Sequence, residues 1–261
     1  MQGLKRINIT GCPCDVISLA QTIDNISNTI KTNGQIRVVP LNVDVIMKAK
    51  RSKELAENLW ASDLVVADGV PVVWGASFLG EPVLGRVNGT DLAWVCARLS
   101  AEHDIGVAMI GGQYEVSLRA ANVMRDRYAK ALLYPFHTPF PLLQKDSQIL
   151  VSKIKASGAK ILLVALGAPR QEQWLQAYLQ QTGANVGLAV GGSFDIISGN
   201  RRRAPLWMQN YGLEWFHRML LEPKRLGKRY LLENSLFLWH IAHEVFLRRV
   251  EGLCKRVDRY L

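Results

Sequence analysis

Short apolar runs that alternate with amphipathic segments constrain the fold of this sequence more than any other feature. Six runs are typical of buried strands, namely Ile36–Leu41, Leu64–Ala67, Ile105–Ile110, Ala131–Tyr134, Lys160–Leu166 and Val186–Val190. Six segments have helical periodicity, namely Thr22–Lys31, Val43–Trp60, Thr90–Ala101, Tyr114–Lys130, Asp146–Ala156 and Gln171–Gln181. This alternation predicts an α/β, Rossmann-like fold, in which a mainly parallel sheet has helices on both faces.

Glycine or proline follows several of the expected strands, as turns between strands and helices require. These turns are Asp68-Gly69, Gly111-Gly112, Gly167-Ala168-Pro169 and Gly191-Gly192. Ligands of open parallel sheets bind beyond the carboxyl ends of the strands. The functional site is therefore expected at these turns.

Composition excludes some classes of protein. Of 261 residues, 49% are apolar and 21% are charged, which is typical of a folded chain and not of a disordered one. Four cysteines, at 12, 14, 96 and 254, are too few for a disulfide scaffold, and reduced thiols are expected. We expect no signal peptide, because Met1–Thr10 has no apolar core of signal length. We expect no transmembrane helix, because the apolar segment 230–250 is interrupted by Glu233, His240, His243 and Glu244.

Positive charge concentrates near the C-terminus. The net charge is +10, to which residues 201–261 contribute 13 Lys/Arg and 6 Asp/Glu, or +7. We expect an α/β domain over residues 1–200 and a basic, helical appendage over 201–261, with helices at Leu206–Leu221 and Pro223–Val250. Nucleic acid, phospholipid or a phosphorylated substrate would complement this charge, and a solvated basic helix face is the alternative. No nucleic-acid-binding motif is present, so a nucleic-acid partner is not expected.

Asp68 is the first candidate for catalysis. It follows a buried strand, where a carboxylate facing the cleft can act as a general base, although a turn aspartate or a helix N-cap is equally compatible. Arg86 lies in a loop before an apolar helix and could contact a sugar or a phosphate. Thr90 or Asp91 is expected to cap that helix, and Asp91 is also a candidate for binding the sugar-nucleotide donor.

Two further turns carry candidate ligand-binding residues. Gln171 can donate hydrogen bonds to, and accept them from, a hydroxyl-rich ligand or a uracil. Glu172 places a negative charge in the first turn of the helix, where it interacts favourably with the helix dipole. Gly191 and Gly192 would let a nucleotide approach the backbone, and Asp195 could accept from sugar hydroxyls. Neither a dinucleotide-binding fingerprint nor a P-loop is present.

A bound metal is not expected. The chain has no Asp-x-Asp pair, and His240 and His243 lack an evident third ligand. Cationic side chains should therefore neutralise a phosphate, and the candidates are Arg218, Arg225, Lys228 and Arg229.

Together these motifs resemble the WecG/TagA/CpsF glycosyltransferase family (glycosyltransferase family 26). The resemblance covers roughly residues 5–232 and rests on the order and spacing of several motifs. They are Leu41-Asn42-Val43-Asp44, Ala67-Asp68-Gly69, Arg86-Val87-Asn88-Gly89-Thr90-Asp91-Leu92, Gly167-Ala168-Pro169-Arg170-Gln171-Glu172-Gln173-Trp174, Val190-Gly191-Gly192-Ser193-Phe194-Asp195, Arg203-Ala204-Pro205, Gly212-Leu213-Glu214-Trp215 and Glu222-Pro223-Lys224-Arg225.

The resemblance implies transfer of a sugar from a UDP-sugar to a polyprenyl-diphosphate-linked saccharide, with inversion and without metal or other cofactor. It also implies that the enzyme acts at the cytoplasmic face of the bacterial inner membrane, in the synthesis of cell-surface polysaccharides or exopolysaccharides. By matching motif, Asp68 falls on the family's proposed general base, and Asn42, Arg86, Gln171 and Asp195 match the sugar-nucleotide pocket. Arg218, Arg225 and Lys228, with Arg229 adjacent, match the basic appendage that engages the diphosphate.

Two departures leave the donor sugar open. Pro40 stands where many members have threonine, and Pro71 where many have glycine. A different class of protein, a non-catalytic binder of anionic lipid or another polyanion, would use the same basic end of the chain. Homo-oligomer formation is compatible with either function.

Overall fold

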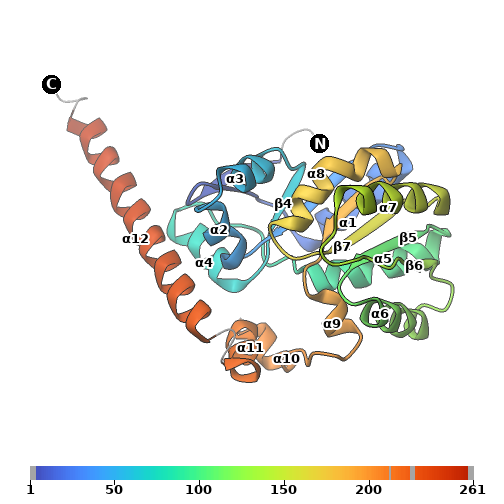
Figure 1. The fold of residues 1–261 in the computed structure, drawn as a ribbon. Coiled ribbons are helices and arrows are strands. Elements are labelled where there is room, and N and C mark those ends of the chain that lie inside the picture. The colour runs from blue at the N-terminus through green and yellow to red at the C-terminus, as the bar shows by residue number, and fades with distance from the viewer. Residues whose placement is uncertain (1–3, 212, 224–226, 258–261) are drawn as a thin grey trace.

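The computed structural model describes residues 4–211, 213–223 and 227–257, and leaves the side chains of 210, 218, 228–231 and 251–257 undescribed. A six-stranded, all-parallel sheet with the order β4-β3-β8-β7-β5-β6 lies at its centre. The strands are β3 (Ile36–Leu41), β4 (Leu64–Ala67), β5 (Val107–Gly111), β6 (Leu133–Pro135), β7 (Ile161–Ala165) and β8 (Val186–Ala189). The predicted α/β, Rossmann-like fold is confirmed (Figure 1).

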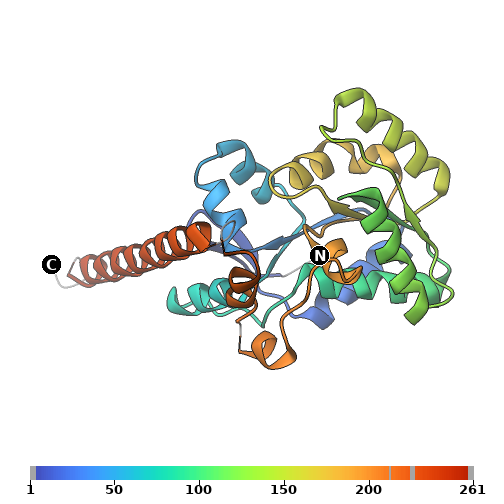
Figure 2. The same ribbon diagram turned by 60° about the horizontal axis from the view of Figure 1, so that its bottom comes forward.

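Helices cover both faces of the sheet, as Figure 2 shows from a second direction. One face packs against α1 (Leu19–Lys31), α5 (Gly89–His103), α6 (Tyr114–Arg127) and α9 (Ser193–Ile197). The other face packs against α2 (Val43–Ala49), α3 (Lys53–Trp60), α4 (Val70–Phe78), α7 (Gln144–Ser157) and α8 (Arg170–Thr182). Adjacent residues of one strand serve opposite faces, since Val38 belongs to the first core and Val39 to the second. The strand sequences are apolar, except for Arg37 of β3 and Tyr134 of β6, because both faces are buried.

Several elements differ from the sequence-based expectations. The segment Val43–Trp60 forms two helices and not one, because Ser52 caps α3 by accepting a hydrogen bond from the Leu55 amide at 3.2 Å. An antiparallel hairpin of β1 (Arg6–Ile9) and β2 (Cys12–Asp15) precedes the sheet and was not predicted. Helix α4 was also missed, because its apolar residues show no helical periodicity.

The C-terminal segment contains three helices, α10 (Leu206–Asn210), α11 (Glu214–Leu221) and α12 (Lys228–Val257). The expected helix Leu206–Leu221 is therefore divided in two, and α12 extends beyond its expected end at Val250. Helix α12 packs against α2 and α4 and then projects from the body of the molecule (Figure 1).

The contact between α12 and α4 is close. Phe237 and Ile241 are buried, and a Cβ atom at Gly75 would lie 3.0 Å from the Phe237 ring. Glycine at position 75 therefore allows the two helices to approach.

Cys12, Cys14 and Cys96 are buried free thiols, as expected, and Cys254 lies among the undescribed side chains. Burial raises the pKa of each of the three to about 12. Of the helices in the described part of the chain, none has both the length and the apolar character needed to cross a bilayer.

Candidate active site

The carboxyl ends of the parallel strands bring the predicted turns to one edge of the sheet. Asp68 follows β4 directly, and its amide donates to the Leu41 carbonyl of β3 at 2.8 Å. The Val87 amide donates to the Ala67 carbonyl, also at 2.8 Å, which places Arg86 and Asn88 beside Asp68. Residues far apart in the sequence thus converge on one carboxylate.

Asn88 orients Asp68. Its Nδ2 donates to Asp68 Oδ1 at 2.9 Å, while its Oδ1 accepts from the Thr90 amide at 2.8 Å as the N-cap of α5. The capping bond fixes which end of the amide faces Asp68. The sequence-based prediction of Thr90 or Asp91 as the cap was wrong, because the cap is Asn88. The preference of asparagine for N-caps was the signal that could have identified it.

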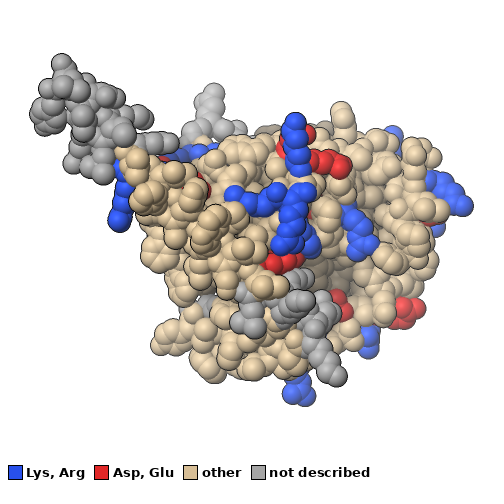
Figure 3. Space-filling view, turned by 60° about the vertical axis from the view of Figure 1, so that its left-hand side comes forward, with Lys and Arg blue, Asp and Glu red and all other residues tan. Residues whose placement is uncertain are grey.

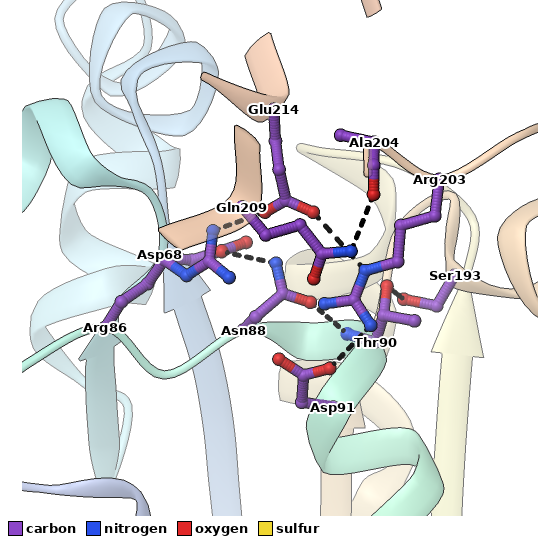
Figure 4. Close-up of polar contacts among 10 residues, drawn as sticks. All are labelled: Asp68, Arg86, Asn88, Thr90, Asp91, Ser193, Arg203, Ala204, Gln209 and Glu214. Atoms are coloured by element: carbon purple, nitrogen blue, oxygen red, sulfur yellow. Dashed lines mark hydrogen bonds and ion pairs between the residues drawn. The ribbon is translucent and has the colours of Figure 1, made fainter. Parts of the chain in front are cut away.

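An ion-pair network links this site to the C-terminal segment (Figure 4). Glu214 of α11 accepts from Arg86, and the second oxygen of Glu214 lies 3.3 Å from Arg203 Nε. Arg203 Nη1 is also 2.8 Å from Asp91 of α5. Burial alone would lower the pKa of Arg203, but the hydrogen bonds and charges of Asp91 and Glu214 outweigh burial and raise it.

A cavity of about 1050 Å³ opens at the ends of β5 and β7, at the same edge of the sheet. Ligand pockets have volumes of about 300–1,000 Å³, so this one is large. Gly111 and Gly112 line it, and Asp195 of α9 is the predicted ligand-binding residue on its wall. Arg170 also lines it, with its guanidinium 4.9 Å from the Phe140 ring centroid. Ser193, two residues before Asp195, hydrogen-bonds Thr90 at 2.9 Å and so ties this wall to the Asp68 site.

Gln171 and Glu172 form a buried layer under the glycine turn. The Gly191 amide donates to Gln171 Oε1 at 3.1 Å, and Gln171 Nε2 donates to Glu172 Oε1 at 2.8 Å. Only 1% of Glu172 is exposed, and its Oε2 has no hydrogen-bond partner among the described residues. Burial raises the pKa of Glu172 above its usual value.

The other predicted residues have defined places. Asn42 caps α2 by accepting from the Val45 amide at 3.1 Å. The positive φ of Gly191, +53°, suits glycine, and a Cβ at Gly192 would lie 3.4 Å from Arg201. Arg218 lies on α11 and Lys228 and Arg229 begin α12, but their side chains are outside the described part, as is all of Arg225.

Sequence analysis missed three residues of this site, Asn88, Arg203 and Glu214, although all three lie within motifs of the resemblance. No three His, Cys, Asp or Glu side chains of the described part gather closely enough to hold a metal ion.

Comparison with known proteins defines the class to which this fold and site belong. Residues 7–251 match the Glycosyl transferase WecG/TagA/CpsF family, and the chain belongs to that family of glycosyltransferases. The resemblance inferred from the motifs is thereby confirmed.

Among curated relatives, the N-acetylglucosaminyldiphosphoundecaprenol N-acetyl-beta-D-mannosaminyltransferase of Staphylococcus aureus strain NCTC 8325 is 26% identical. The alignment covers 91% of this chain and 92% of that relative. The protein of the same name from strain MRSA252 is 25% identical over the same shares of both chains.

Proposed function

We propose that this glycosyltransferase moves a hexose or N-acetylhexosamine from a UDP-sugar to a polyprenyl-diphosphate-linked saccharide, with inversion and without a metal ion. The observation that supports this most is Asp68, a carboxylate held by Asn88 at the edge of the sheet where a large cavity also opens. The acceptor class is supported by the activity for which the Staphylococcus aureus relatives are named, which uses an N-acetylglucosaminyldiphosphoundecaprenol.

The proposed reaction is a single displacement. Asp68 takes the proton of an acceptor hydroxyl, and the oxygen of that hydroxyl forms a bond to the anomeric carbon. The bond from that carbon to the UDP oxygen breaks, and UDP leaves with the electron pair. A general base of this kind contributes about 10²–10⁴-fold to the rate. Attack from the face opposite UDP inverts the anomeric configuration.

Each part of the site has a proposed role. The cavity at β5 and β7 receives the nucleotide, with Asp195 accepting from sugar hydroxyls and Gly111 and Gly112 allowing close approach. Arg86 stabilises the leaving diphosphate, together with the basic residues of the C-terminal segment. Gln171, held by Glu172, positions the Gly191-Gly192 turn.

The proposed location is the cytoplasmic face of the bacterial inner membrane, with the basic C-terminal segment associating peripherally with anionic lipid. The alternative function, a non-catalytic binder of anionic lipid, rests on that same segment. Turnover separates the two functions, because a binder forms no product.

The test is a screen of UDP-sugars with a synthetic lipid-diphosphate saccharide, read as released UDP and as product mass. We expect one donor to give a product heavier by one sugar, with turnover unaffected by a chelator. Vesicle binding without product from any donor would support the non-catalytic alternative. Loss of turnover with the chelator would overturn metal independence.

A further inference from the structure

An uncharged, apolar surface lies beside Asp68 on the catalytic body of the protein. Helix α4 begins at Val70, two residues after Asp68, and has no charged residue. Two of its side chains, Trp74 and Phe78, are 54% and 63% exposed. On a helix they lie one turn apart on the same side, about 6 and 12 Å along the axis from Val70.

Helix α12 extends this surface. The buried side chains of Phe237 and Ile241 pack on Gly75, which lies between Trp74 and Phe78 in the sequence. Leu238, next to Phe237, is 55% exposed. Trp74, Phe78 and Leu238 therefore border the same helix contact, and we refer to them as the α4–α12 surface. Figure 3 views this side of the molecule, where a broad area bears few charged side chains.

The two acids of the adjoining part of α12 point into protein contacts. Glu233 is only 7% exposed and lies 3.8 Å from Arg51 of the turn after α2. Glu244 accepts from the Thr10 amide at 3.1 Å and from Arg248 at 2.8 Å. Neither carboxylate therefore places an unpaired negative charge on the outer side of the helix.

The order of charges along α12 favours one occupant of this surface. Lys228 and Arg229 precede the apolar stretch, Arg249 follows it beside Arg248, which is paired with Glu244, and no Lys or Arg lies between them. A second copy paired along α12 would bring like charges together at both ends, in parallel or antiparallel orientation. An anionic bilayer would attract both ends and accept the exposed aromatic side chains between them.

We propose that the α4–α12 surface docks on an anionic lipid bilayer and sets Asp68 close to the membrane plane. This inference rests on the proposed function, since the acceptor hydroxyl is separated from its lipid only by a saccharide and a diphosphate. It adds α4, an element of the α/β body, to the membrane contact proposed for the C-terminal segment. Docking on a bilayer would explain why Trp74 is exposed beside a site that takes a lipid-linked substrate.

The test compares wild-type protein with the double variant Trp74→Ser/Phe78→Ser, and with Ile149→Ser as the matched control. Ile149 of α7 is 52% exposed and lies on a different part of the fold. On vesicles of phosphatidylcholine with phosphatidylglycerol, we expect the double variant to bind at least about tenfold more weakly, because it loses the apolar part of binding. The control should bind as the wild type does.

A second measurement uses two acceptors. With a long polyprenyl acceptor in vesicles, the double variant should lose turnover in proportion to binding, whereas with a short, water-soluble acceptor it should match the wild type. Unchanged vesicle binding would overturn the proposal, and a variant that instead loses self-association would assign the surface to a second copy. If the wild type turns over neither acceptor, the proposed function fails, while the vesicle measurement still decides the docking surface.

Discussion

The hydrogen bond from Asn88 to Asp68 can be removed without removing the helix cap. Serine at position 88 would still cap α5, whereas alanine would not. Both variants lose the hydrogen bond to Asp68, so Asn88→Ser should be more stable than Asn88→Ala by about 1 kcal/mol, the typical value of an N-cap.

Loss of the same hydrogen bond should also lower turnover in both variants. A hydrogen bond to a charged group contributes about 1.5–3 kcal/mol. Since about 1.4 kcal/mol corresponds to a tenfold change in rate, both variants should lose roughly 10- to 150-fold in turnover if that bond orients the base.

The assay is UDP release at saturating donor, with urea unfolding on the same samples. Asn88→Ser separates the two roles of Asn88, because it retains the cap and loses only the donor to Asp68. Wild-type turnover in Asn88→Ser would refute the claim that Asn88 orients the base. A fall in stability equal to that of Asn88→Ala would show that serine does not replace the cap.

Three further predictions concern stability. A double-mutant cycle of Glu214→Gln and Arg203→Gln, followed by urea unfolding, should give a coupling of at least about 0.5 kcal/mol because the pair is partly buried; additive effects would contradict the ion pair. Phe237→Ala should weaken the packing of α12 on α4 by about 3–5 kcal/mol, and amide hydrogen exchange should become faster in α12 but not in the sheet. Unchanged exchange in α12 would contradict its packing on Gly75. Burial raises the pKa of Glu172, so the native state loses stability as pH rises from the usual glutamate range through that raised pKa, and Glu172→Gln should gain stability over the wild type in that window; parallel pH profiles of unfolding would contradict this.

Sequence patterns predicted the parts of the fold that depend on local composition. The six strands are almost wholly apolar, and the turns after most of them contain glycine or proline, so the sheet and its candidate functional edge followed from the sequence. Helix α4 did not, because it is apolar on all sides and lacks a period. The division of Val43–Trp60 depended on a single capping residue, Ser52, within an otherwise helical pattern.

The candidate site was predicted only in part, because some of its contacts join residues that are far apart in the sequence. Asp68 was identified because it directly follows a buried strand. The partner of Arg86 is Glu214, 128 residues away, and no local pattern specifies which acid a given arginine meets. Gln171 and Glu172 were expected to contact ligand, whereas the structure buries them in contact with each other, which depends on the packing of α8 beneath the Gly191 turn.

The most direct test of the central claim is turnover by Asp68→Asn, measured together with UDP binding. Asparagine has nearly the shape of aspartate but cannot take the acceptor proton, so we predict wild-type UDP affinity and a fall in turnover of about 10²–10⁴-fold. Undiminished turnover in Asp68→Asn would contradict the account.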